Sequence, residues 1–379
     1  MGNFYDTMHS ISLTCQAGLE SLVHRDSKKL GLQNITVSDR FIQGKADLET
    51  VYRLLVGSRF ANRVYLELAK SSTQDFDGLF DLCFQIPWSK YIDEGKEIIT
   101  EATAIRSKLS HLPSIQSITK KAIIKSLTKE RDSQHWNEKR GGDEIHIHTI
   151  IKDDKSHILL DITGLPLHKR GWRKQAGEAP LKENLAAALV AFSLWRFGET
   201  FVDPMCGSGT IAIEAALLAR NIAPGKNRSF AIKHTKIHDE ESLQNAKSEL
   251  AAKEYPSGKY TIIAADRDES IIQIAKENAK KAGVLEDIDF RVADFKETIK
   301  KIKKPATLVS NPPYGVRLET EDLDDLYREI FDFMGQKDIS GGIITSYEGA
   351  KKYIDTSLFK NRKLYNGSIE SRFWYKKKS

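Results

Sequence analysis

The sequence predicts an α+β region followed by an α/β region with a mainly parallel sheet, and two observations lead to this fold class. Up to about residue 165, short alternating strands are mixed with helices; Ile145 and Ile147, for example, alternate with His146 and His148. Beyond that point, apolar strand segments and helices take turns along the chain, as in parallel sheets covered on both faces. The 379 residues are enough for two or three domains.

In the N-terminal region, alternation predicts strands and helical spacing predicts helices. The predicted strands are 10–14, 35–37, 40–43, 62–68, 97–104, 144–151 and 157–162, and the predicted helices are 18–28, 48–60 and 115–127. Gly31 suits a helix stop, and the residues KDDKS between the last two strands suit a hairpin. His146 and His148 have the spacing of a metal pair, but such a pair more often lies on the solvated face of a strand, so no metal site is predicted.

In the C-terminal region, strands and helices alternate one by one. The predicted strands are 201–202, 260–265, 289–292, 306–310, 341–346 and 370–375, and the predicted helices are 181–197, 210–220 and 269–281. The 57 residues from Gly209 to Asp266 exceed a minimal strand–helix–strand unit. We therefore expect an extra strand and helix within 227–259.

Composition excludes several classes of protein. No apolar run approaches the roughly 20 residues of a membrane helix, and the N-terminus lacks the basic and apolar segments of a secretory signal. Cys15, Cys83 and Cys206 are far apart, which argues against a disulfide framework or a cysteine-based zinc site. We expect a cytoplasmic protein with no membrane partner and no metal. The net charge of +6 mildly favours a polyanionic partner.

The stretch FVDPMCGSGT, residues 201–210, combines a strand, an acid, a glycine-rich turn and a helix start. Gly207 and Gly209 would let the backbone approach a ligand, and the helix starting near Thr210 would present free N–H groups. The spacing is not that of a dinucleotide fingerprint, because the third residue after Gly209 is Ile213. A Walker loop is excluded because no Lys-Ser or Lys-Thr pair follows.

Polar residues stand at the ends of four strands of the predicted parallel sheet: Asp203, Asp266, Asp294 and Asn311. Parallel strands end at one rim, where such sheets bind ligands. Asp266 is suited to accept hydrogen bonds from ribose hydroxyls. Asp294 is suited to accept one from an adenine amino group, with Phe295 bordering the ring.

This pattern resembles class I S-adenosylmethionine-dependent methyltransferases over residues 180–330. The resemblance rests on DPMCGSGT, Asp266, Asp294 and NPPY, and it implies a Rossmann-like domain with a mainly parallel seven-stranded sheet and S-adenosyl-L-methionine as cofactor. The implied cofactor-binding residues are Asp203, Met205, Cys206, Gly207, Gly209, Asp266, Asp294 and Phe295. The helix start at Lys182, Glu183 and Asn184 would add one or two polar groups to the pocket.

The NPPY motif, residues 311–314, resembles that of methyltransferases acting on amino groups of nucleic-acid bases. Asn311 and the Pro312 carbonyl would each accept one N–H of a flipped-out base, and Tyr314 would stack on it. Catalysis would then come mainly from orientation and from stabilising the growing positive charge. The motif leaves adenine N6, cytosine N4 and guanine N2 open.

Two basic stretches are candidates for RNA contact. Residues 120–140 carry seven basic and three acidic residues, and 167–175 carry four basic residues and a tryptophan. Basic groups beside an aromatic ring suit phosphate contact with base stacking. The candidate RNA-binding residues are Lys120, Lys121, Arg170, Trp172 and Arg173.

The whole layout resembles bacterial guanine-N2 methyltransferases of 23S ribosomal RNA. The carrying pieces are residues 101–127, LLDITGLPLHKRGWR, APLKENLAAAL and FVDPMCGSGTIAIEAA. The resemblance implies a ferredoxin-like segment (1–60), a THUMP RNA-binding domain (61–163) and a methyltransferase domain (164–379), with 23S rRNA or a large-subunit assembly particle as partner. The alternatives are a tRNA guanine-N2 or nucleic-acid adenine-N6 methyltransferase, and a non-catalytic RNA-binding or ribosome-assembly factor.

Overall fold

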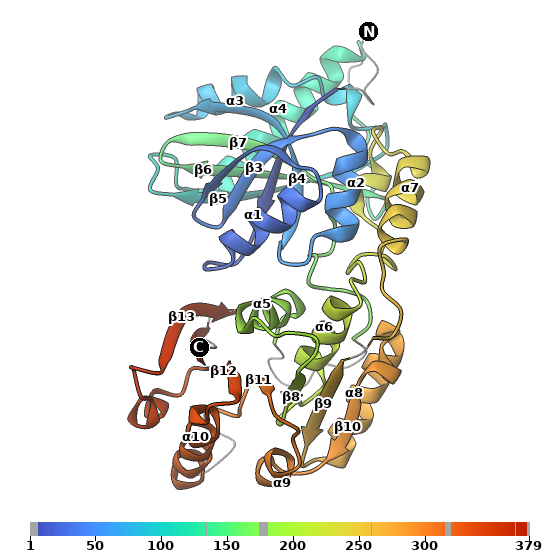
Figure 1. Ribbon diagram of the computed structural model, residues 1–379. Helices are drawn as coiled ribbons and strands as arrows, with labels where there is room; N and C mark the ends of the chain where they lie inside the picture. Colours follow the sequence, from blue (N-terminus) through green and yellow to red (C-terminus); the bar gives the residue numbers. More distant parts are fainter. Residues whose placement is uncertain are drawn as a thin grey trace. The chain divides into compact units, whose positions relative to one another are not determined.

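The computed structural model describes residues 7–132, 135–173, 181–258, 260–314, 320–367 and 369–376 (Figure 1). The chain forms two compact units, each with its own seven-stranded sheet. The first unit contains residues 1–15, 24–167 and 228–248, and the second contains 16–23, 168–227 and 249–379. The segment 228–248 thus packs with the N-terminal unit, although it lies inside the predicted methyltransferase domain. The predicted domain boundaries stay predictions.

The sheet of the first unit has the strand order β2-β3-β1-β4-β7-β6-β5 and is antiparallel except for the parallel pair β5 and β6. The elements in chain order are β1 (His9–Thr14), α1 (Glu20–Lys29), β2 (Gln33–Ser38), β3 (Phe41–Ala46), α2 (Leu48–Gly57), β4 (Arg63–Ser72), α3 (Phe76–Phe84), η2 (Trp88–Lys90), β5 (Glu97–Ile105), α4 (Leu112–Glu130), β6 (Glu144–Lys152) and β7 (Lys155–Asp161). Strand β4 pairs with β1 on one side and β7 on the other, so one sheet crosses the predicted 60/61 boundary.

The alternation predicted for β6 is confirmed. Ile145, Ile147, Thr149 and Ile151 are buried, while the intervening residues are half-buried. The buried side faces α4, where the Thr119 and Thr149 hydroxyls lie 3.0 Å apart. On the other side, His148 lies 2.9 Å from the Thr103 hydroxyl. Strand β4 carries a bulge at Leu68, between the Glu67–Leu159 and Ala69–Ile158 pairs, which interrupts its predicted alternation.

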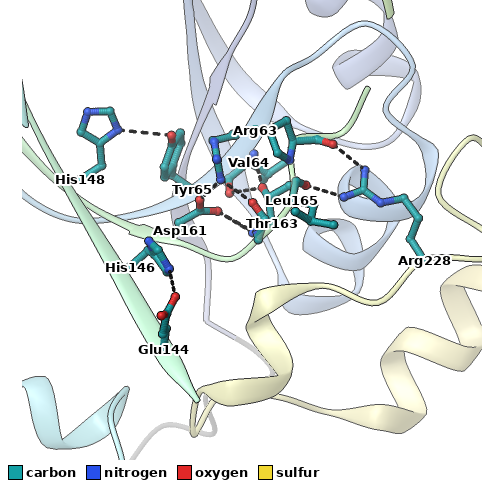
Figure 2. A network of polar contacts seen from close by, with 12 residues as sticks. Arg63, Val64, Tyr65, Glu144, His146, His148, Asp161, Thr163, Leu165 and Arg228 are labelled. Atoms are coloured by element: carbon teal, nitrogen blue, oxygen red, sulfur yellow. Dashed lines mark hydrogen bonds and ion pairs between the residues drawn. The ribbon is translucent and has the colours of Figure 1, made fainter. Parts of the chain in front are cut away.

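A polar network fastens the chain after β7 to strand β4 (Figure 2). Arg63 forms an ion pair with Asp161 and donates to the Gly164 carbonyl at 2.5 Å. Thr163 exchanges hydrogen bonds with the backbone of Val64, at 2.7 and 2.8 Å. Arg228 donates to the carbonyls of residues 165 and 166, which brings the start of segment 228–248 onto this network.

The sheet of the second unit has the order β10-β9-β8-β11-β12-β14-β13. The elements from α5 onward are α5 (Glu183–Ser193), β8 (Thr200–Asp203), α6 (Thr210–Ala219), η3 (Ala231–His234), α7 (Glu240–Ala251), β9 (Thr261–Asp266), α8 (Glu269–Ala282), η4 (Leu285–Asp287), β10 (Asp289–Val292), α9 (Phe295–Lys300), β11 (Ala306–Ser310), α10 (Thr320–Gly335), β12 (Ile339–Thr345), η5 (Glu348–Tyr353), β13 (Phe359–Asn366) and β14 (Ile369–Lys376). The first five strands in this order are parallel, and β14 runs antiparallel to both of its neighbours, β12 and β13. The predicted Rossmann-like sheet is confirmed.

Two expectations for the second region were incomplete. Within 227–258, the structure has the short 3₁₀ helix η3 and helix α7 but no strand. The apolar residues that suggested a strand, Phe230, Ile232 and Ile237, are buried in η3 and the backbone beside it. The sequence analysis also missed α10 and β13. Strand β13 alternates weakly because five of its eight residues have charged or amide side chains.

Candidate functional site

The order of the second sheet reverses between β8 and β11, and ligands of open parallel sheets bind at such a switch point. These neighbouring strands end in Asp203 and Ser310. The Ser310 hydroxyl donates to Asp203 Oδ1 at 2.6 Å, and both residues are buried, with 0% and 1% of their surface exposed. A buried hydrogen bond therefore joins the two strand ends from which the glycine-rich loop and the NPPY corner begin.

Burial has a strong effect on Asp203. It raises the pKa of this carboxyl to about 7, and the hydrogen bond from Ser310 counteracts the rise only in part. Its carboxylate also accepts a backbone hydrogen bond from Met205. With these partners, Asp203 orders the glycine-rich loop from the sheet side. Its direct contact with the cofactor stays a prediction.

Three further contacts fix the loop over the sheet. The Cys206 N–H donates to the Ala265 carbonyl at 2.8 Å, the Gly207 N–H donates to Asp266 Oδ2 at 3.0 Å, and Asn278 donates to the Ser208 carbonyl at 3.1 Å. Sequence reasoning missed Asn278, which lies on α8 outside every motif. Burial and the nearby carboxylates of Asp203 and Asp266 raise the pKa of the Cys206 thiol, so it stays protonated and unreactive.

The two glycines of the loop serve different purposes. Gly207 has a φ of +51°, and a Cβ placed there would meet no heavy atom within 4 Å, so its backbone is open to a ligand as predicted. Gly209 has a φ of +82°, but its Cβ would lie 3.1 Å from the Cβ of Ala275. Gly209 is thus required for the close approach of α6 to α8, a packing reason that the sequence analysis did not foresee.

Asp266 and Asp294 stand at the ends of adjacent parallel strands, where Val292 pairs with Asp266. Asp266 is half-buried, and its Oδ1 accepts the Asp268 N–H at 3.1 Å. Asp294 is exposed and caps α9 by accepting the Glu297 N–H at 2.7 Å. Both carboxylates therefore reach the rim of the sheet, as predicted for groups that hold a ribose and an adenine.

Phe295, which the sequence analysis assigned to the adenine, packs mainly against the protein core. Its surface is only 5% exposed, and its ring packs edge-on against Phe333 with 6.4 Å between the ring centroids. It belongs to the core between the sheet and α10. Its contact with the adenine stays a prediction.

Helix α10 and strand β12 support the NPPY corner. Asn311 and Tyr314 are half-buried at the end of β11. The buried Tyr327 of α10 donates to the Pro313 carbonyl at 3.3 Å and lies 2.5 Å from the Thr345 hydroxyl. Burial raises the pKa of Tyr327, which keeps it a proton donor. Sequence reasoning missed this residue because it missed α10.

The predicted RNA-binding stretch 167–175 is partly interior in its described part, where Arg170 is buried and Lys169 is exposed. Arg170 forms an ion pair with Glu214 at 3.2 Å, and their side chains are 1% and 0% exposed. Trp172 is buried as well. Arg173 pairs with Glu183 at 3.2 Å and donates to Thr210 at the start of α6. The two arginines therefore pair with acidic residues inside the second unit. The role of Arg170, Trp172 and Arg173 in RNA binding stays a prediction.

The remaining RNA-binding candidates lie on α4. Lys120 forms an ion pair with Glu138 at 2.9 Å, whereas Lys121 is exposed. Their role in RNA binding stays a prediction. In the described part of the chain, no cluster of three or more His, Cys, Asp or Glu side chains has the arrangement of a metal site. Among the same residues, no helix has the length and apolarity to cross a bilayer.

The strand order, the reversal between β8 and β11, and the open glycine turn beside the strand-end carboxylate of Asp266 are those of a class I S-adenosylmethionine-dependent methyltransferase. Family models narrow this class. Residues 170–373 match the family described as "RMKL-like, methyltransferase domain", and residues 10–65 match the "RlmL ferredoxin-like domain". The chain belongs to the RMKL-like methyltransferase family, and its cofactor is S-adenosylmethionine.

Known relatives agree with this assignment. "Putative RNA methyltransferase YpsC" of Bacillus subtilis (strain 168) is 34% identical over 97% of this chain and 95% of its own length. "Ribosomal RNA large subunit methyltransferase K/L" of Psychromonas ingrahamii is 35% identical over 85% of this chain. The alignment covers 44% of that relative, so the chain spans about half the length of the K/L enzymes. The crystal structure of SMU.472 complexed with SAH has 32% identity and a TM-score of 0.89, with 99% of both chains covered.

Proposed function

We propose that this protein methylates the exocyclic N2 amino group of a guanine in large-subunit ribosomal RNA, with the base flipped into the NPPY corner. The observation that carries the proposal is the buried Ser310–Asp203 hydrogen bond of 2.6 Å. It ties the loop proposed to hold the cofactor to the strand end that presents Asn311. The names of the K/L relatives support ribosomal RNA as the substrate.

The residues fit S-adenosylmethionine. The open side of Gly207 leaves room for a ligand against the backbone, and Asp266 is half-buried at the neighbouring strand end. We assign the amino-acid part to the loop around Gly207 and the ribose to Asp266, with Asp294 toward the adenine. When bound, the cofactor supplies an electrophilic methyl group.

The protein's own contribution is to orient the acceptor. An exocyclic amino group is a weak nucleophile because its lone pair is delocalised into the ring. The Asn311 side-chain oxygen and the Pro312 carbonyl each accept one N–H, which turns the lone pair toward the methyl group. Proline fixes the backbone at this corner, and Tyr327 anchors the next carbonyl. Tyr314 stacks on the base, so most of the rate enhancement comes from orientation and from stabilising positive charge.

The test is transfer of a radiolabelled methyl group to hypomodified 23S rRNA, to tRNA and to duplex DNA, followed by identification of the labelled nucleoside. We expect N2-methylguanosine in rRNA. Label in tRNA only, or in adenine, would replace this substrate assignment by one of the alternatives. Mapping the rRNA nucleotide that loses its methyl group when the gene is deleted then locates the target.

A second test separates catalysis from RNA binding. Asn311→Ala removes one of the two N–H acceptors, and we expect at least a 100-fold loss of rate at an RNA affinity within about twofold of the wild type, since positioned groups of this kind contribute about 10²–10³. The matched control is Asn227→Ala, which changes an exposed asparagine. Equal turnover of the Asn311 variant and the wild type would favour a non-catalytic RNA-binding protein.

A further inference from the structure

Helices α3 and α4 of the first unit carry two parallel rows of side chains that the proposed chemistry does not use. Phe76, Phe80 and Phe84 stand one turn apart on α3 and are half-buried. Lys121, Lys125 and Lys129 stand one turn apart on α4 and are exposed. Figure 1 shows the two helices side by side. We call these six residues the Phe–Lys ridge.

The two rows are in register. The Phe80 and Phe84 rings stack at 5.7 Å with an interplanar angle of 15°. The Lys125 ammonium lies 5.8 Å from the centre of the Phe80 ring, and the Lys129 ammonium lies 5.2 Å from the centre of the Phe84 ring. Each of these turns of the ridge therefore pairs one partly accessible aromatic ring with one cation.

The ridge is not the side by which these helices hold the fold. Helix α3 buries Leu79 and Cys83, and helix α4 buries a different stripe, which includes Ile115, Ala122 and Ile123. Half-exposed phenylalanines in a row are costly on a surface that meets only water, because their apolar area stays hydrated. A row of this kind beside lysines suits a partner that brings both flat rings and negative charge.

We infer that the Phe–Lys ridge binds an unpaired segment of RNA, with bases stacked on the phenylalanine rings and phosphates held by the lysines. Every base has a flat face, so stacking tolerates any sequence, and lysines on flexible stems adapt to the backbone. Paired RNA hides its base faces and does not offer this match. The inference rests on the proposed function for its choice of RNA as the polyanion.

Two exposed acidic residues lie beside the ridge and give a further test of phosphate binding. Asp77 and Asp81 of α3 are exposed next to the phenylalanine row. The Glu130 carboxylate is instead occupied by the N–H groups of Trp88 and Ser89, at 3.0 Å each. If phosphates run along the ridge, the two aspartates weaken binding, and Asp81→Asn tightens it.

The experiment measures binding of a fluorescent, unstructured single-stranded RNA to the full chain by anisotropy, without cofactor and over a range of salt concentrations. We expect Phe80→Leu, which keeps an apolar side chain, to weaken binding at least about fivefold, and Phe80→Tyr to keep it, because stacking needs a ring. The triple variant Lys121→Gln, Lys125→Gln, Lys129→Gln should lower the slope of log affinity against log salt by about 2, at about 0.7 per phosphate contact.

The matched control removes the same three charges from the exposed lysines 300, 301 and 303 of the second unit, and a duplex of the same RNA is the second probe. Equal weakening by both triple variants, an unchanged affinity of Phe80→Leu, or a preference for the duplex would overturn the inference. Binding is measured without methyl transfer, so the two proposals fail separately. If the wild-type chain methylates no RNA but the ridge variants still lose RNA binding, the inference about the ridge stands and the proposed function is rejected.

Discussion

The buried carboxyl of Asp203 makes a quantitative prediction about stability. Its pKa in the folded protein is about 7, against 3.8 for the unperturbed group. A difference of about three units at 1.36 kcal/mol each corresponds to about 4 kcal/mol between the protonated and ionised forms. The folded state binds this proton more tightly than the unfolded state does. The contribution of Asp203 to the free energy of unfolding is therefore largest at low pH, and it is lost as the pH rises from about 4 to about 7.

Asp203→Asn removes this titration with little change in shape. The amide oxygen can accept the Met205 hydrogen bond, and the Ser310 hydroxyl can rotate to accept from the amide nitrogen. The folded and unfolded pKa values of Asp203 differ by about three units, and about two of these lie between pH 5 and pH 8.5. We therefore expect the variant to gain about 3 kcal/mol relative to the wild type over this interval, measured as the free energy of unfolding in urea at both pH values.

The difference between the two proteins isolates Asp203 from the other titrating groups, which are common to both. Asp332→Asn, a change of an exposed aspartate in the same unit, is the control and should show no such gain. A constant difference between Asp203→Asn and the wild type at the two pH values would refute the reasoning. It would mean that the carboxyl under the glycine-rich loop is already ionised at little cost.

Three other substitutions test the site. Gly209→Ala should destabilise the protein by roughly 1–3 kcal/mol through its clash with α8 and its left-handed backbone, whereas Gly207→Ala should mainly weaken binding of S-adenosylhomocysteine; thermal unfolding and calorimetry distinguish the two. Tyr327→Phe should lower the rate of methyl transfer more than RNA affinity, because it frees the Pro313 carbonyl; an unchanged rate would remove Tyr327 from the support of the corner. Arg170→Met should cost about 3–5 kcal/mol by removing the ion-pair partner of the buried Glu214, and the double variant with Glu214→Leu should recover most of it; an intact stability accompanied by weaker RNA binding would instead support Arg170 as an RNA contact.

The sequence was most informative where polar residues follow apolar strands. Asp203, Asp266, Asp294 and Asn311 were all placed correctly at strand ends, because period, glycine turns and strand rhythm are local properties of the chain. Their partners were not predictable in the same way. Ser310 stands beside Asn311 in the motif, yet its bond to Asp203 joins residues 107 positions apart.

The burial of predicted site residues could not be read from the sequence. Phe295 and Arg170 lie in patterns typical of ligand contact, but the patterns do not say which face of an element is covered. Phe295 follows a strand-end acid and then turns into the core against Phe333. Arg170 belongs to a basic run, but its charge is neutralised by Glu214 on α6, 44 residues away. Burial depends on contacts between distant segments, and composition cannot supply it.

Helix α3, which the sequence analysis did not predict, shows the same limit: here a candidate surface was overlooked. Its nine residues, FDGLFDLCF, include a glycine and two aspartates and bury only Leu79 and Cys83, so helical spacing is hard to distinguish from an irregular apolar run. Once α4 is placed beside it, the three phenylalanines become a row next to a row of lysines. The basic character of 120–140 was visible in the sequence, whereas the aromatic partners came from a segment 45 residues earlier. An RNA-binding surface of this kind is a property of two helices together, and only their packing reveals it.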